Sequence, residues 1–155
     1  MIKILFVCHG NICRSPMAEF LFRDLLQKQG LADRALVASA ATSAEEIGNP
    51  VYPPARRKLA EFGIRTDGKT AARLTRSDYA RWDYLIGMER VNLRNMRAIF
   101  GPKDPAGKLH LLLDFTDRPG EIDDPWYTRD FDTACKEILR GCRGLLDHLR
   151  RTGEL

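Results

Sequence analysis

Four short apolar runs alternate along the chain with segments of helical period, and this alternation narrows the possible folds more than any other feature. The runs predict strands at residues 3–8, 35–40, 84–88 and 108–113, and the patterns between and after them predict helices at 16–29, 53–63, 76–81, 89–99 and 131–151. Strands that alternate with helices indicate a parallel sheet covered on both faces, with right-handed crossovers. We therefore expect an α/β fold of three layers with a four-stranded parallel sheet.

The length of 155 residues is that of one domain, and we expect residues 1–155 to form a single domain. Hydrophobic residues make up 44% and charged residues 30% of the chain, which is ordinary for a globular protein. No apolar run approaches the roughly 20 residues that a membrane span needs. The chain begins with a strand pattern instead of a secretory signal, so we expect no membrane insertion and a cytoplasmic location.

Charge and metal-ligating residues exclude two further classes of function. The net charge of +4 favours anionic substrates but falls short of the charge that nucleic-acid binding needs. The three histidines are scattered, and the four cysteines, at positions 8, 13, 135 and 142, form no C-x-x-C pair. We therefore expect no metal site, no cofactor and no nucleic-acid partner.

The segment KILFVCHGNICRSPM, residues 3–17, carries the chemistry that the sequence predicts. The first strand leads directly into a loop that starts at Cys8, and the first helix follows Arg14 and Ser15. Gly10 and Asn11 tolerate positive φ, so the loop can direct several backbone N–H groups at one point. The helix N-terminus adds free donors and a partial positive charge there. This combination predicts a site for a tetrahedral oxyanion, with the Cys8 thiol beneath it.

The loop resembles that of the low molecular weight protein tyrosine phosphatases, which is a Cys, five residues, an Arg and a Ser near the N-terminus. Two further stretches resemble the same family: Asp124-Pro125-Trp126-Tyr127, and YLIGMERVNLRNM at residues 84–96. The resemblance covers essentially the whole chain. It implies a metal-free phosphatase whose substrate is a phosphotyrosine-containing protein or a small aryl phosphate.

Cys8 is the predicted nucleophile, because a helix N-terminus and a neighbouring arginine favour the reactive thiolate. The resemblance implies that Ser15 donates its hydroxyl to this thiolate. Arg14 is predicted to bind phosphate, since its planar guanidinium matches two oxygens at once. The plain alternatives are a buried structural cysteine and a solvent-exposed arginine. The second is unattractive, because a cation at a helix N-terminus opposes the helix dipole unless an anion binds there.

Asp124 is the predicted general acid, which protonates the leaving phenolate and then activates water. The following proline favours an extended conformation at Asp124. The rivals on the same long connection are Asp114, Asp117, Asp123 and Asp130. Trp126 and Tyr127 are expected to form a wall of the cleft against a substrate ring, although both could instead anchor the loop on the core.

The other loop residues are expected to surround the phosphate: His9, Gly10, Asn11, Ile12 and Cys13. His9 is interpreted as a residue of the rim, because sequence neighbours rarely form a Cys-His dyad. The resemblance implies that Cys13 can form a disulfide with Cys8 that protects it from over-oxidation; a packing role is the alternative. Ser39 and Ser43 are possible supports of the loop.

Two departures from the family pattern concern the surroundings of the loop. Where many members place an aromatic residue that lines the cleft, this chain has the residues at 44–47, Ala-Glu-Glu-Ile. Many members also have a histidine that supports the loop asparagine, and residues 66–70 contain none. We expect Lys69 or Thr70 to supply this support.

Three other functions fit parts of the pattern. Arsenate reductases of the same fold use a similar loop, but they need further cysteines, and residues 80–100 contain none. Arginine phosphatases tend to have Thr where this loop has Ile12. A catalytically silent phosphate-binding module would lack Cys8, Arg14 or Asp124, and all three are present.

Overall fold

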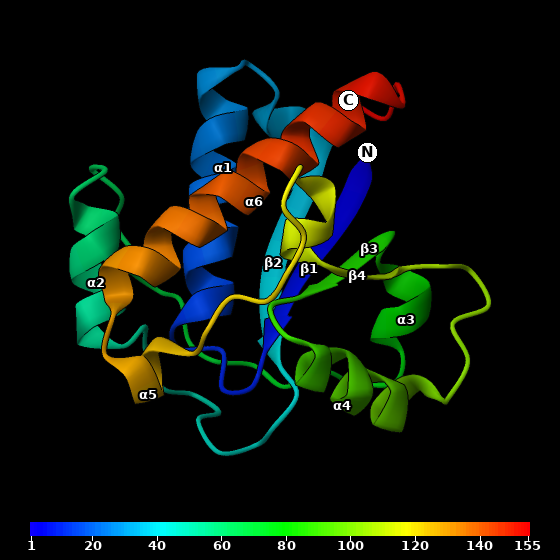
Figure 1. Cartoon of the computed structure of the whole chain (residues 1–155), viewed down its shortest axis with the longest axis horizontal. Helices are drawn as coiled ribbons and strands as arrows, with labels where there is room; N and C mark the ends of the chain where they lie inside the picture. The colour runs from blue at the N-terminus through cyan, green and yellow to red at the C-terminus, as the bar shows by residue number, and fades with distance from the viewer.

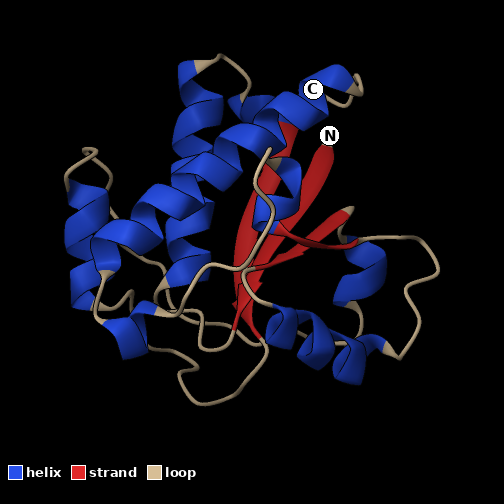
Figure 2. Cartoon of the chain, in the orientation of Figure 1, coloured by secondary structure: helices blue, strands red, loops and turns tan.

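The computed structural model describes residues 1–155, and it has the predicted three-layer α/β architecture (Figure 1). Four parallel strands form one sheet in the order β2-β1-β3-β4. The strands are β1 (Ile2–Cys8), β2 (Ala35–Ala41), β3 (Tyr84–Gly87) and β4 (Leu109–Leu111). Figure 2 shows the strands as a twisted layer between two groups of helices. The predicted fold class is confirmed.

The helices lie on both faces of the sheet, as the alternating pattern predicts (Figure 1). The α-helices are α1 (Arg14–Lys28), α2 (Pro53–Ala60), α3 (Asp78–Arg81), α4 (Arg90–Phe100), α5 (Pro125–Thr128) and α6 (Phe131–Arg151). Two short 3₁₀ turns, η1 (Ala32–Arg34) and η2 (Leu112–Phe115), complete the list. In the view of Figure 1, α1, α2 and α6 lie to the left of the sheet, and α3 and α4 to its right.

Alternate side chains of β1 divide the core into two parts, because successive residues of a strand point to opposite faces. Ile4 and Phe6 are fully buried in the larger core, which includes residues of α1, α2 and α6. Leu5 and Val7 belong to the smaller core, with Trp82 and residues of β3 and α4. Burial on both faces explains why β1 is a continuous apolar run.

The fourth strand is shorter than the predicted range of 108–113. It ends at Leu111, and the next residues turn into η2. The Asp114 carboxylate accepts a hydrogen bond from the Leu111 backbone N–H at 3.1 Å, which stabilises the turn. Leu112 and Leu113 are buried all the same. An apolar run bounded by a turn does not by itself distinguish a strand from a buried turn.

One helix was not predicted. Residues 125–128 fall in the stretch that the sequence indicates as a long connection, yet they form the single turn α5. Pro125 occupies its first position, where the missing N–H has no cost, and Asp124 caps it.

None of the helices combines the length and the apolar composition that a membrane-spanning segment needs.

Candidate active site

The predicted phosphate loop lies at the carboxyl edge of the sheet, between Cys8 at the end of β1 and Arg14 at the start of α1. β1 has β2 on one side and β3 on the other, so the loop lies where the strand order reverses. Open α/β sheets bind ligands at such a point. Asn11 has a φ of 59°, as predicted for this loop, whereas Gly10 does not use positive φ.

A buried chain of hydrogen bonds connects Cys8 to the interior. The Cys8 Sγ lies 3.0 Å from the Ser15 Oγ. The Asn11 side-chain amide donates to the Ser15 Oγ at 2.7 Å and to the Ser39 Oγ at 2.9 Å. Because Ser15 accepts from Asn11, its own hydroxyl proton is free to be donated to the Cys8 sulfur. The backbone N–H of Ala72 donates to the Asn11 Oδ1 at 3.1 Å and fixes the orientation of this amide.

A buried carboxylate extends the same chain. The Ser39 hydroxyl donates to the Glu19 Oε1 at 2.5 Å, and Glu19 is only 3% exposed. The Lys69 Nζ lies 3.4 Å from the same oxygen and donates to the Ser39 carbonyl at 3.1 Å, while Arg23 pairs with the other Glu19 oxygen at 2.7 Å. Lys69, one of the two expected supports, thus contacts Ser39 and Glu19, whereas the loop asparagine itself is held by the Ala72 backbone N–H, Ser15 and Ser39. Ser39 connects Asn11 to Glu19, a role that its sequence context did not indicate.

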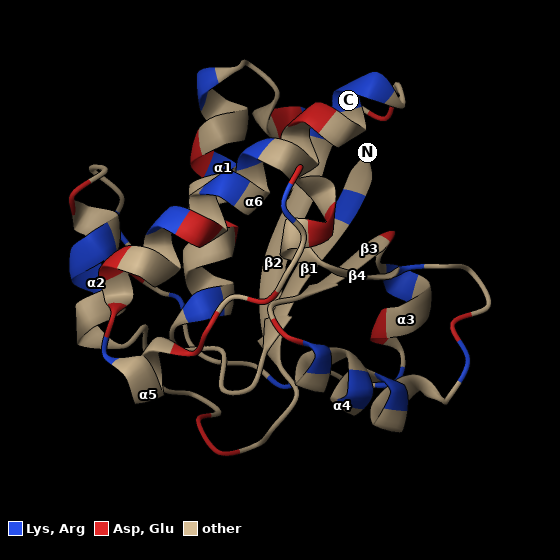
Figure 3. Ribbon diagram, in the orientation of Figure 1, with Lys and Arg blue, Asp and Glu red and all other residues tan.

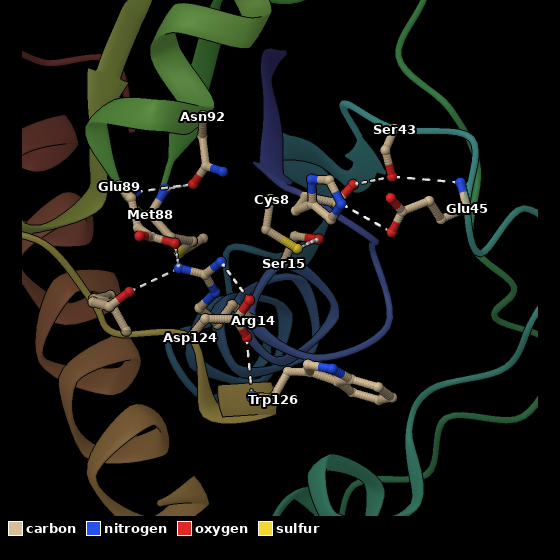
Figure 4. Close-up of polar contacts among 12 residues, drawn as sticks. Cys8, Arg14, Ser15, Ser43, Glu45, Met88, Glu89, Asn92, Asp124 and Trp126 are labelled. Carbon is tan, nitrogen blue, oxygen red and sulfur yellow. Dashed lines mark hydrogen bonds and ion pairs between the residues drawn. The ribbon is translucent and has the colours of Figure 1, made fainter. Parts of the chain in front are cut away.

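Arg14 is almost fully buried, at 1% exposure, and its guanidinium is held by three acceptors (Figure 4). Its Nη1 donates to the Ile122 carbonyl at 2.8 Å and to the Glu89 carboxylate, and its Nη2 lies 3.4 Å from the Asp124 Oδ2. Burial alone would lower the pKa of Arg14, but the negative charges of Cys8, Asp124 and Glu89 raise it above its usual value. The alternative of a solvent-exposed arginine is wrong.

Glu89 is a residue that the sequence reasoning missed. It is the N-cap of α4, two residues beyond the end of β3, and its backbone N–H donates to the Asn92 Oδ1 at 2.9 Å, which leaves its carboxylate to Arg14. A signal was present, since a carboxylate that follows the strand next to β1 must lie at the same edge as Cys8.

Asp124 lies opposite the loop, on the short segment before α5. Its φ of −75° and ψ of 113° are extended, as the following proline predicts. Its Oδ1 accepts from the Trp126 backbone N–H at 3.0 Å, which leaves the Oδ2 directed toward Arg14 (Figure 4). Asp123, the nearest rival, is exposed and does not line the pocket. Asp114 and Asp130 cap η2 and α6 instead.

These groups surround one cavity of about 120 Å³. Its lining consists of Cys8, His9, Gly10, Asn11, Ile12, Cys13, Arg14, Glu45, Glu46, Asp124, Trp126 and Tyr127. Of the predicted site residues, only Ser15 is not in the lining, because it lies behind Cys8. A larger hollow of about 1270 Å³ lies at the amino ends of the strands, near Tyr84 and His148, but no cysteine lines it.

Trp126 and Tyr127 form one wall of the cavity, and only Trp126 is fixed from behind. Its ring lies 4.9 Å from that of Tyr52, centroid to centroid, and the Arg129 guanidinium lies 5.3 Å from its ring centroid. Arg129 also donates to the Tyr52 hydroxyl at 2.9 Å. Trp126 thus packs against Tyr52 and also lines the cavity, and its contact with a substrate ring stays a prediction. Tyr127 is 81% exposed.

His9 and Cys13 differ in their access to solvent. The His9 Nε2 lies 3.0 Å from the Glu45 Oε2 on the rim, and its partner there is a carboxylate instead of the Cys8 thiol. Cys13 is a free, buried thiol. Burial raises the pKa of Cys13 to about 12, with further contributions from the charges of Cys8 and Asp124. Cys13 therefore stays protonated at neutral pH, and its protective disulfide with Cys8 stays a prediction.

Comparison with known proteins agrees with this geometry. Residues 3–155 match the family model described as low molecular weight phosphotyrosine protein phosphatase. The chain belongs to this family.

Three relatives of this phosphatase illustrate the range of the family. The low molecular weight protein-tyrosine-phosphatase YfkJ of Bacillus subtilis is 38% identical over the full length of both chains, and its crystal structure superposes with a TM-score of 0.94, covering 98% of this chain and 96% of that one. A human low molecular weight phosphotyrosine protein phosphatase is 38% identical over 94% of each chain. The structure of DARP, a drosophila arginine phosphatase, is 31% identical with a TM-score of 0.84, covering 95% of this chain and 97% of that one.

Proposed function

We propose that this phosphatase hydrolyses phosphotyrosine monoesters through a phosphocysteine intermediate on Cys8. The observation that carries the proposal is the shared cavity. A thiol, a guanidinium and a carboxyl group line about 120 Å³, which suits a phosphate group with the atoms that adjoin it. Residues 1–155 would form one catalytic domain with this cavity as its active site.

In the first step, the Cys8 thiolate attacks phosphorus. Ser15 stabilises the thiolate by donating its hydroxyl proton toward the sulfur across 3.0 Å. The backbone N–H groups of His9, Gly10, Ile12 and Cys13 and the N-terminus of α1 bind the phosphate oxygens, with Asn11 holding the turn. Arg14 binds two of these oxygens with its planar fork, and this contact strengthens as charge shifts onto them in the transition state.

Asp124 protonates the leaving phenolate oxygen in the same step. The resulting carboxylate then removes a proton from the water that hydrolyses the phosphocysteine. Asp124 lines the same cavity as Cys8, and its Oδ2 lies 3.4 Å from the Arg14 Nη2, which supports this assignment. Trp126 and Tyr127 bind the substrate ring.

Glu89 is proposed as a positioning residue that acts through Arg14. It accepts from the Arg14 Nη1, as the Ile122 carbonyl also does, and together they fix the plane of the guanidinium. Arg14 loses little conformational freedom when phosphate binds, because its orientation is set beforehand. A thiol nucleophile needs a reducing compartment, and we therefore propose that the protein works in the cytoplasm.

Two alternative reactions have less support. Arsenate reduction needs a relay of accessible cysteines, and Cys135 and Cys142 are buried in α6 at 5% and 0% exposure. The arginine phosphatase among the structural relatives makes phosphoarginine hydrolysis a real alternative. Ile12 in the cavity lining favours the apolar ring of tyrosine over a guanidinium.

The test is hydrolysis of an aryl phosphate by the purified protein with a chelator present, beside the Cys8→Ser variant. We expect metal-independent turnover that falls at least about 10⁴-fold in Cys8→Ser, because a serine hydroxyl is not ionised here. Phosphate should still inhibit any residual reaction, since the cradle is intact. Turnover of Cys8→Ser within tenfold of wild type would refute the assignment. Faster hydrolysis of phosphoarginine than of phosphotyrosine peptides would favour the arginine phosphatase.

A further inference from the structure

Two glutamates lie on the rim of the cavity. Glu45 and Glu46 lie on the loop between β2 and α2, which is the acidic segment at the bottom of Figure 3. Figure 4 shows Glu45 and Trp126 on different sides of Cys8. We call the pair of glutamates the acidic wall, and Trp126 with Tyr127 the aromatic wall. Arg14 is the only arginine or lysine among the lining residues, and it lies deep in the cavity.

No lysine or arginine pairs with the acidic wall. The Glu45 side chain is 68% exposed, and its partner is the half-exposed His9 at 3.0 Å. Glu46 accepts a hydrogen bond from the neutral Asn49 amide at 2.6 Å and makes no ion pair. Arg14, in contrast, already faces the carboxylates of Glu89 and Asp124. The entrance to an anion-binding cavity therefore has an excess of negative charge, which by itself weakens the attraction of any phosphorylated substrate.

Negative charge at the rim would attract a substrate that carries positive charge next to its phosphate. We propose that the acidic wall selects phosphotyrosine segments that carry a lysine or arginine next to the phosphotyrosine, and disfavours acidic ones. This inference rests on the proposed function and names its substrate class. The phosphate binds in the loop, the ring lies along the aromatic wall, and the neighbouring basic side chain reaches Glu45 or Glu46 at the rim. The same carboxylates repel acidic neighbours, so both attraction and repulsion contribute to selectivity.

The experiment compares kcat/KM for three phosphotyrosine peptides of equal length at low ionic strength. The residues on both sides of the phosphotyrosine are lysine, alanine or glutamate. We expect the lysine peptide to exceed the alanine peptide by about two- to fivefold and the glutamate peptide to fall below it by a similar factor, the scale of exposed ion pairs. The differences in kcat/KM should shrink at about 0.5 M salt, because salt screens the interaction between the peptide charges and the glutamates.

The variants test where the preference originates. In the double variant Glu45→Gln with Glu46→Gln, the three peptides should converge, and Glu45→Lys should reverse their order. Asp33→Asn is the control, because Asp33 is exposed on η1 at the opposite end of β2 and the substitution removes a negative charge far from the cavity. It should keep the preference.

Two results would overturn the inference, and a third is separate. Equal kcat/KM for the three peptides in wild type would refute it, and so would a preference that persists in the double variant. Loss of hydrolysis for every phosphotyrosine peptide would instead overturn the proposed function, and with it this inference.

Discussion

The floor and the rim of the active-site cavity are built in opposite ways. On the floor, Cys8, Asn11, Arg14 and Ser15 are all at most 3% exposed and held by fixed hydrogen bonds. On the rim, Glu45 is 68% exposed by its side chain, and Tyr127 is 81% exposed as a residue. Rigid, buried groups suit bond-breaking chemistry, because their geometry costs nothing to reorganise. Exposed groups can vary without loss of the fold, which suits the choice of substrate.

This contrast predicts that substitutions of the floor residues and of Asp124 lower the rate strongly. Substitutions at the rim should change substrate affinity slightly. After the loss of the nucleophile itself, the largest effect should be that of Asp124→Asn, which should lower kcat for a phenol leaving group by about 10²–10⁴. The loss should shrink for better leaving groups, which need no proton. The measurement is kcat over a series of aryl phosphates with graded leaving-group pKa.

Asp123→Asn is the control for this prediction, since it makes the same change one residue away on an exposed side chain. If Asp123→Asn shows the leaving-group dependence and Asp124→Asn does not, the acid has been assigned to the wrong neighbour.

A smaller effect is expected at Lys69, which supports the floor from behind. Its Nζ donates to the Ser39 carbonyl at 3.1 Å and lies 3.4 Å from the buried Glu19. Lys69→Met should lower stability by about 1–2 kcal/mol, since it leaves buried acceptors without this partner. Because Ser39 connects through Asn11 to Ser15, kcat should fall by about three- to tenfold, and Cys8 should react more slowly with an alkylating agent.

The readouts separate positioning from plain structure. Thermal unfolding measures stability, and the rate of Cys8 alkylation by iodoacetamide at neutral pH measures the reactivity of the sulfur. Lys69→Arg should restore both, while Lys28→Met, which removes an exposed cation paired with Asp24, should change neither. A drop in stability with an unchanged alkylation rate would limit Lys69 to a structural role.

The sequence predicted the floor better than its supports, for a physical reason. Cys8, Asn11, Arg14 and Ser15 lie in one short segment, where a strand, a loop and a helix leave few arrangements. Glu89 reaches Arg14 across 75 residues of sequence, and Lys69 reaches Ser39 across 30. Such contacts depend on how the strands and loops pack, which local patterns do not specify. Lys69 was predicted to support the loop asparagine, and it contacts the Ser39 carbonyl instead.

The same limit explains the errors in the fold. The run at 108–113 has the composition of a strand. Leu112 and Leu113, however, are buried within a turn that the Asp114 side chain stabilises. The turn α5 needs only the Asp124 cap and the proline after it. Each outcome depends on one side-chain hydrogen bond, and a pattern of apolar residues does not report such bonds.

The smallest effect should come from the aromatic wall. Trp126→Leu removes a ring that packs on Tyr52 and Arg129, but the backbone N–H of residue 126 still donates to the Asp124 carboxylate. The acid should keep its position, so kcat should change little. KM for an aryl phosphate should rise by about threefold, since an aromatic contact contributes about 0.5–1.5 kcal/mol. Tyr127→Leu is the matched control and should raise KM less, because Tyr127 has no aromatic partner and is mostly exposed. A fall in kcat for Trp126→Leu as large as that for Asp124→Asn would show that the indole ring positions the acid, and the division between floor and rim would then fail at this residue.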